Sequence, residues 1–106
     1  MSEITRISDQ LAHISDKRPY HEFLRVPGMS AGLYVLQVDA TDGQSPHKED
    51  EIYYVIRGRA KMQLGREERE ALAGDVIFVE RNLEHRFFDI VEELILLVVF
   101  APAESG

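Results

Sequence analysis

Cysteine is absent from this chain of 106 residues, and its absence excludes several classes of protein at once. Disulfide-stapled scaffolds, zinc ribbons and enzymes with a thiol nucleophile all depend on cysteine. A metal site in this sequence has only imidazole and oxygen ligands to use. That restriction points away from a structural zinc and towards an open, exchangeable site.

Basic residues and long apolar runs are also scarce. The 12 basic and 19 acidic side chains give a formal net charge of −7, whereas a general nucleic-acid binder needs a basic face for the phosphates. The longest apolar run, Leu94–Ala101, is far shorter than the ~20 residues of a membrane helix. The first residues lack the basic and apolar segments of a secretory signal. We therefore expect a cytoplasmic protein that binds neither nucleic acid nor membranes, with a small molecule among its partners.

The remaining composition is that of one folded domain. Hydrophobic residues make up 44% of the chain and charged residues 29%, which is ordinary for a globular protein. We predict a single domain over residues 1–106, with an N-terminal helix at about 3–14 and a barrel at about 20–101. The helix is predicted from apolar residues at positions 4, 7, 11 and 14, with Ser2 as its N-cap.

Everything after Pro19 has the pattern of short strands separated by turns, which predicts an antiparallel sandwich or barrel. The last strand, Leu94–Phe100, is apolar on both faces and must be covered on both sides. A long helix could cover the outer face of this strand, but the N-terminal helix is short. A second subunit is the other candidate to cover it, and we expect a homodimer. The expected strands are 20–26, 33–38, 51–57, 59–64, 70–72, 76–79, 86–90 and 94–100.

Two histidines and a glutamate stand at positions that face the expected interior. In an extended chain His47, Glu51 and Tyr53 share one face, and the apolar bulk around Tyr53 indicates that this face is inside. His85 opens a later strand, where Phe87 has the same parity. An imidazole and a carboxylate inside a barrel are costly to desolvate unless they are paired or bind a metal.

The spacing of these residues resembles that of the cupin superfamily. The first cupin motif runs G-x5-H-x-H-x3-E-x6-G, and His47, Glu51 and Gly58 match its second His, its Glu and its closing Gly. The second motif runs G-x5-P-x-G-x2-H-x3-N, and Gly74 and His85 match its opening Gly and its His. The resemblance implies an all-β double-stranded β-helix, the jelly-roll or cupin barrel, of the small single-domain type.

Several positions depart from the cupin pattern. Ser45 stands where the first His is expected, and cupin metals are usually held by three histidines and one glutamate. Asn82 replaces a glycine, which is a mild change because Asn tolerates the left-handed backbone region. The other departures are Asp39 for the opening Gly, Glu80 for the Pro and Asp89 for the final Asn.

By resemblance, the metal ligands are His47, Glu51 and His85, and the ion is divalent: Fe, Zn, Mn or Ni. Water, substrate or the Gln44 side chain would complete the ligand set, and the Ser45 hydroxyl would donate a hydrogen bond nearby. Glu49 is a further candidate ligand, although a solvated turn acid is the simpler interpretation. The predicted pocket walls are Tyr53, Phe78 and Phe87.

The predicted function is a small cupin that binds a divalent metal ion inside the barrel. A metal-dependent enzyme of oxygenase or isomerase type, acting on a small oxygenated molecule, is the activity such a centre would support. Gln44 or Tyr53 would then orient water or substrate, but the sequence assigns no catalytic residue. The alternative is a non-catalytic cupin that holds a small ligand without metal, with the His and Glu side chains as a buried polar network.

Overall fold

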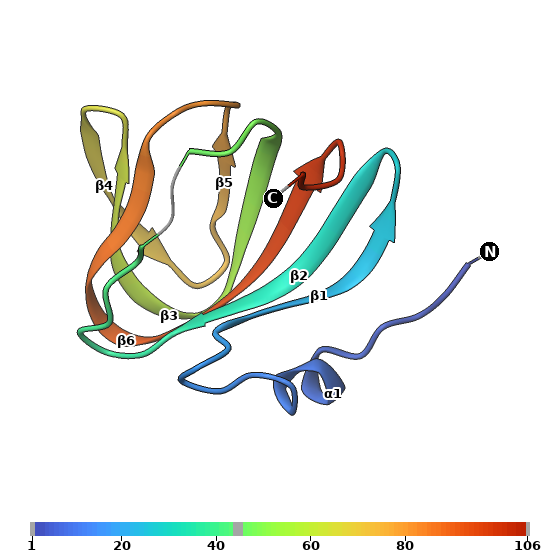
Figure 1. Cartoon of the computed structure of the whole chain (residues 1–106). Coiled ribbons are helices and arrows are strands. Elements are labelled where there is room, and N and C mark those ends of the chain that lie inside the picture. The colour runs from blue at the N-terminus through green and yellow to red at the C-terminus, as the bar shows by residue number, and fades with distance from the viewer. Residues whose placement is uncertain (1, 44–45, 106) are drawn as a thin grey trace.

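The computed structural model describes residues 2–43 and 46–105, which form one short helix and a six-stranded antiparallel sheet (Figure 1). The prediction of an all-β fold with a short N-terminal helix is confirmed. The strands are ordered β1-β2-β6-β3-β4, and β5 also pairs with β3. The elements are α1 Ile7–Leu11, β1 Tyr20–Val26, β2 Met29–Leu36, β3 Asp50–Leu64, β4 Glu67–Leu72, β5 Val76–Val79 and β6 His85–Ala101.

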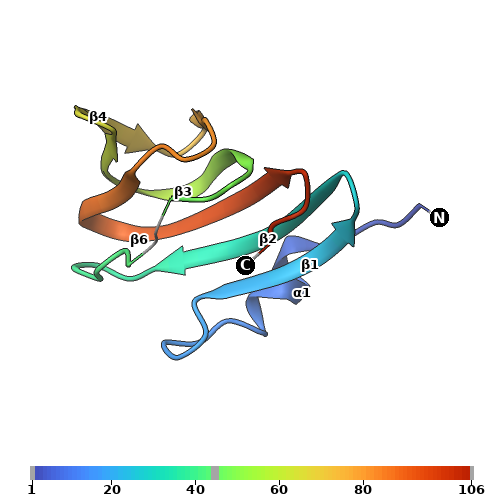
Figure 2. The same cartoon turned by 45° about the horizontal axis from the view of Figure 1, so that its top comes forward.

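The two longest strands, β3 and β6, each take part in both ends of the curved sheet (Figures 1 and 2). The first half of β3 pairs with β5 and the end of β6, whereas its second half pairs with β4 and the start of β6. The halves meet at Gly58, whose φ of 101° is in the left-handed region. A Cβ there would collide with the backbone oxygen of Glu93. The predicted strand end at Gly58 is therefore wrong, because the glycine bends the strand without ending it.

The segments predicted as separate strands at 86–90 and 94–100 are likewise one strand, β6. Its ladder with β3 shifts register at several points between Val55 and Lys61, which is how a long strand curves. Inside the curve lies the hydrophobic core. Its fully buried members include Tyr53, Val55, Met62, Phe87, Ile90, Leu94, Leu96, Val98 and Phe100.

The N-terminal helix is shorter than the sequence predicts. It covers five residues, with Arg6 rather than Ser2 at the N-cap position and no side-chain cap. Ile4, predicted on the apolar stripe, is 93% exposed, whereas Ile7 and Leu11 pack against the outer face of the sheet. A helix of five residues is too short to carry all four apolar residues of the predicted stripe on one face. Packing against the sheet, and not helical periodicity, therefore determines which of these residues are covered.

This N-terminal segment covers part of the outer face of the sheet, for which the sequence predicts a covering partner. Ile7, Leu11 and Ile14 contact a buried cluster of Leu33, Val35 and Ile95. Further along β6 the outward side chains at 97 and 99 remain half-buried. None of the described helices is both long and apolar enough to cross a membrane.

Candidate metal centre

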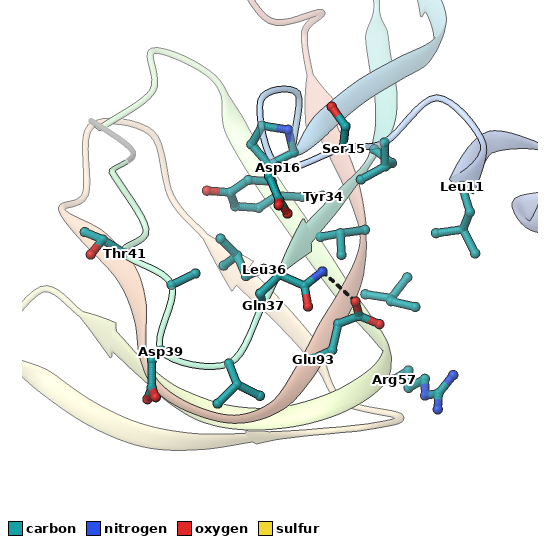
Figure 3. Close-up of a pocket in the computed structure, with 16 residues that line it drawn as sticks. Leu11, Ser15, Asp16, Tyr34, Leu36, Gln37, Asp39, Thr41, Arg57 and Glu93 are labelled. Carbon is teal, nitrogen blue, oxygen red and sulfur yellow. Dashed lines mark hydrogen bonds between the residues drawn. The ribbon is translucent and has the colours of Figure 1, made fainter.

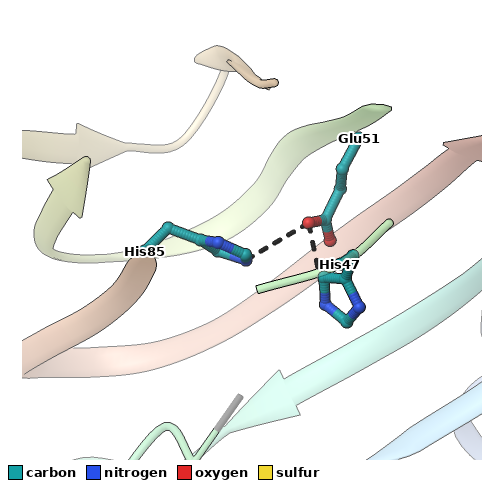
Figure 4. A group of neighbouring side chains, drawn as sticks. All are labelled: His47, Glu51 and His85. Carbon is teal, nitrogen blue, oxygen red and sulfur yellow. Dashed lines mark ion pairs between the residues drawn. The ribbon is translucent and has the colours of Figure 1, made fainter. Parts of the chain in front are cut away.

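Two regions far apart in sequence bring the three predicted ligands together at one end of the interior (Figure 4). His47 lies in the loop before β3, Glu51 lies on β3 and His85 begins β6. One ligand atom from each residue lies within 4.8 Å of the others. Oε1 of Glu51 is 3.2 Å from Nε2 of His85 and 3.9 Å from Nε2 of His47.

Glu51 is the least solvated member of the group. Its residue is 1% exposed, and neither carboxylate oxygen has a hydrogen-bond partner among residues 2–43 and 46–105. A buried carboxylate without donors is strongly unfavourable, and such groups in native proteins are paired with charge or coordinate a metal. The environment of Glu51 therefore fits a cation.

The backbone sets the orientation of the His85 ring. Its Nδ1–H donates to the carbonyl oxygen of Leu83 at 2.9 Å, which leaves the Nε2 lone pair facing Glu51. The Tyr53 hydroxyl donates to this Nε2 at 3.2 Å. Burial lowers the pKa of His85, but the Glu51 carboxylate and the Leu83 carbonyl outweigh burial and leave this pKa raised. An imidazole fixed through one nitrogen, with the other facing a carboxylate, is the usual arrangement of a metal-binding histidine.

The Nε2 atom of His47 also faces Glu51. Its Nδ1 lies 3.2 Å from Oε2 of Glu104, and its ring packs edge-on against Phe100 with centroids 4.8 Å apart. The backbone N–H of Asn82 donates to the His47 carbonyl at 2.7 Å. Asn82 has a φ of 67°, so the departure from the cupin glycine is accommodated in the left-handed region. His47 is thus held by side chain, ring and backbone contacts although it lies outside any strand.

The C-terminal segment was not among the residues that the motifs indicated. Glu104 lies beyond both motifs, so no spacing signal could identify it. Burial raises the pKa of its carboxyl group, and the nearby His47 acts in the opposite direction. Glu49 is 5% exposed and accepts hydrogen bonds from Ser105 N at 3.2 Å and Ser105 Oγ at 2.7 Å. Glu49 is therefore neither a solvated turn acid nor part of the ligand group, because it binds the C-terminal segment.

The loop that leads to His47 has a second anchor that the sequence did not indicate. Asp42 is 6% exposed, although the Asp-Gly pair at this position has the pattern of a plain turn. Its carboxylate accepts hydrogen bonds from the Tyr34 hydroxyl at 2.8 Å and from the backbone N–H of Phe87 at 2.9 Å. Gln44 and Ser45, the other predicted candidates in this loop, lie outside the described residues.

A cavity of about 210 Å³ adjoins His47, with room for roughly seven waters at ~30 Å³ each. The hydroxyl of Tyr20 is buried and has no hydrogen-bond partner within the described part of the chain. Burial and the negative charge of Glu104 raise the pKa of Tyr20, so the hydroxyl stays protonated at neutral pH. The lining consists of Tyr20, Tyr34, His47, Val98, Phe100 and Glu104.

The predicted pocket aromatics occupy different places. Tyr53 and Phe87 are both 0% exposed and pack edge-on, 5.0 Å apart, in the core beneath the ligand group. Phe78 is 60% exposed and, contrary to the prediction, does not line the cavity beside His47. Phe78 pairs with Ile52, whose side chain points outwards. All four residues of β5 are apolar, and the sequence therefore gave no alternation from which to read its inner face.

A larger hollow, of about 790 Å³, lies between the N-terminal segment and the end of β2 (Figure 3). Two of its polar side chains pair, since Gln37 Nε2 donates to Glu93 at 2.6 Å. None of the three candidate ligands lines it. The smaller cavity, by contrast, reaches the ligand group through His47. The two imidazole nitrogens and the carboxylate oxygen of this group form a set of acceptors suited to a divalent ion.

Comparison with known proteins agrees with the fold. The Cupin domain family matches this chain over residues 32–100. An uncharacterized protein of Streptomyces coelicolor is 45% identical over 86 residues, which is 81% of this chain and 82% of that protein.

Two solved structures have a similar fold. A conserved protein with a double-stranded β-helix domain from Klebsiella pneumoniae is 19% identical and has a TM-score of 0.85, covering 100% of this chain and 95% of that one. A Cupin 2 conserved barrel domain protein from Salinispora arenicola is 21% identical with a TM-score of 0.69, covering 77% of this chain and 73% of that one. At such identities the two structures show the fold alone.

Proposed function

This chain belongs to the cupin domain family, and from that premise we propose that it binds one divalent metal ion through His47, Glu51 and His85. Glu51 carries the proposal. Its carboxylate is 1% exposed and lies 3.2 and 3.9 Å from two imidazole nitrogens, and its oxygens have no hydrogen-bond donor in the described residues. A cation shared by the three side chains would offset the cost of burying that charge.

We propose further that the centre acts on a small oxygenated molecule in the adjoining cavity. When bound, the ion would polarise an oxygen of that molecule as a Lewis acid. The chain would contribute the Tyr53 hydroxyl, 3.2 Å from His85 Nε2, to orient water or substrate, and the rings of Tyr20 and Phe100 to exclude bulk water. Oxygenase and isomerase chemistry are the types that such a centre supports.

A non-catalytic module that holds a small ligand without metal is the second candidate. The apolar side of the cavity, formed by Val98, Phe100 and the two tyrosine rings, favours it. The two candidates predict different behaviour for His85→Ala. This variant would keep ligand affinity and stability in a metal-free module, but would lose the ion and the ion's stabilisation in a metal-binding cupin.

Metal analysis of protein purified without chelators or a nickel column tests the main proposal. We expect about one ion per chain and a higher melting temperature when Fe, Zn, Mn or Ni is added, because a ligand at 100 times its Kd stabilises by about 2.7 kcal/mol. His13→Ala is the matched control, since His13 is exposed and stacks on His21 away from the centre. Absence of both stoichiometric metal and a thermal shift contradicts the proposal.

We also propose that the chain forms a homodimer through an outer apolar patch, defined as Ile52, Tyr54, Val76 and Phe78. These side chains are 41%, 40%, 66% and 60% exposed, and they form two directly opposed pairs between β3 and β5. Directly opposed residues project from the same face of a sheet, so the patch is continuous. It adjoins the half-buried outward residues of β6 that are opposite Ile52 and Tyr54. A contiguous exposed apolar surface of this kind is typical of a protein interface.

A further inference from the structure

The C-terminal residues after β6 turn back over the end of the interior that contains the candidate metal centre (Figure 1). The backbone of Glu104 is fixed there by two hydrogen bonds. Its N–H donates to Ser30 Oγ at 3.0 Å, and its carbonyl accepts from Arg25 Nη2 at 2.7 Å. Ser105 adds the contacts to Glu49 described above. The main chain around Glu104 is therefore held by β1, β2 and the loop before β3.

The Glu104 side chain points from this anchored backbone to the His47 ring. Its Oε2 lies 3.2 Å from Nδ1, whereas Nε2 of the same ring faces Glu51 at 3.9 Å. The Glu104 and His47 side chains are 22% and 16% exposed, so water competes little for this contact. A carboxylate that accepts the N–H of an imidazole fixes both the tautomer and the ring orientation of a metal-binding histidine.

A comparison of the two histidines shows why His47 needs such a partner. His85 begins strand β6, and a main-chain carbonyl, that of Leu83, accepts its Nδ1–H at 2.9 Å. His47 lies in a loop, and its Nδ1 lies 3.2 Å from the carboxylate of a side chain near the other end of the protein. A carboxylate beside Nδ1 favours the tautomer with the proton on Nδ1, which leaves Nε2, the nitrogen that has to bind the ion, without a proton.

We propose that Glu104 is a positioning residue of the metal centre, which holds His47 as the Nδ1–H tautomer and keeps Nε2 turned towards Glu51. The C-terminal segment is then part of the centre and not only a terminal extension of the barrel. This inference rests on the proposed metal-binding function, because the orientation of His47 serves a purpose only if His47 binds the ion. The orientation of His47, however, is a property of the metal-free protein and is measured separately.

The tautomer of His47 is read from long-range ¹H–¹⁵N correlation spectra of the metal-free protein at alkaline pH, where the imidazoles are neutral. We expect the Nδ1–H form in the wild type. Glu104→Met, which has a similar length and no oxygen acceptor, is expected to shift His47 to the Nε2–H form. Glu104→Gln keeps a carbonyl acceptor and is expected to retain the Nδ1–H form. An unchanged tautomer in Glu104→Met overturns the inference.

Zn²⁺ titration of the same variants measures the consequence for binding. We expect Glu104→Met to weaken Zn²⁺ binding by about 10- to 100-fold, and Glu104→Gln to fall between it and the wild type. Ser105→Ala is the matched control, because it removes the contact between Ser105 Oγ and Glu49 but leaves the Glu104 carboxylate. Its affinity is expected to stay within about twofold of the wild type.

The outcomes separate the inference from the function on which it rests. If Ser105→Ala weakens Zn²⁺ binding as much as Glu104→Met, packing of the segment and not the carboxylate is responsible, and the inference is overturned. If the wild type takes up no Zn²⁺, the proposed function fails. The tautomer spectra then still decide whether Glu104 orients His47.

Discussion

The two halves of strand β3 differ in which kinds of side chain face the interior and which face solvent. In the second half, after the bend at Gly58, Ala60 and Met62 are buried while Arg59 and Lys61 are exposed, as in an ordinary sheet with one solvated face. In the first half Tyr53 and Val55 are buried in the same way, but the pattern is inverted where the half begins. Glu51 is 1% exposed and faces inwards, whereas Ile52 is 41% exposed and faces outwards.

On the proposed function, the difference separates the part of the strand that serves stability from the part that serves binding. An inward carboxylate and an outward aliphatic side chain are both unfavourable in the isolated chain. Each becomes favourable if something binds there, a cation on the inside and an apolar protein surface on the outside. The second half of β3 needs no partner, because its side chains already match their surroundings.

The largest expected effect comes from replacing one buried residue in each half. Glu51→Leu should lower metal affinity by more than about 100-fold, yet stabilise the metal-free protein by about 1–3 kcal/mol, because an apolar side chain replaces a buried carboxylate that has no hydrogen-bond donor in the described residues. Met62→Ala, in the second half, should destabilise by about 2–5 kcal/mol and leave metal affinity unchanged. Denaturant unfolding with and without metal measures both. Destabilisation of the metal-free protein by Glu51→Leu would remove the distinction between the halves.

The next largest effect concerns the outer face. Phe78→Lys should weaken the dimer by about 100-fold, because a charge would be buried within the outer apolar patch. Sedimentation velocity over a range of concentrations measures the dissociation constant. Val91→Lys is the matched control, since Val91 is 54% exposed on β6 but outside the patch. A wild-type protein that remains monomeric, or equal weakening by both variants, would contradict the assignment of this face.

The smallest effect concerns the hydroxyl of Tyr53. In the metal-free protein this hydroxyl donates to His85 Nε2 at 3.2 Å, the nitrogen that an ion would use. Tyr53→Phe should destabilise the metal-free protein by about 0.5–1.5 kcal/mol. Because the lost bond competes with the ion, metal affinity should rise by about fivefold. Tyr34→Phe removes a hydroxyl bound to Asp42 and should leave metal affinity unchanged. Weaker metal binding by Tyr53→Phe would show that the hydroxyl supports the ion.

Where turn residues, alternation or motif spacing give a clear signal, the sequence predicts the structure closely. The expected strands 20–26 and 76–79 have the observed bounds, and Glu51 and Tyr53 face inwards as the period of two requires. The approach of His85 to Glu51 follows from the second motif, although 34 positions separate the two residues and only the barrel brings them together. Local patterns and family spacing are sufficient for these features.

Other features depend on tertiary contacts that no local pattern encodes. The exposure of Phe78 depends on which face of a uniformly apolar strand meets β3. The burial of Asp42 depends on a hydroxyl and an N–H from distant strands. Glu104 contacts His47 only because the chain turns back after β6. Each of these residues is ordinary in its own neighbourhood and takes its role from a segment elsewhere in the chain.

The central claim is that the first half of β3 contains a metal centre, and X-ray diffraction at metal absorption edges tests it most directly. Crystals of protein soaked in Mn²⁺ or Zn²⁺ should give one strong anomalous peak per chain, within about 2.0–2.2 Å of a nitrogen of His47, a nitrogen of His85 and an oxygen of Glu51. The same soak of Glu51→Leu crystals should give no peak at that position. A wild-type map with no anomalous peak among these three side chains would contradict the account.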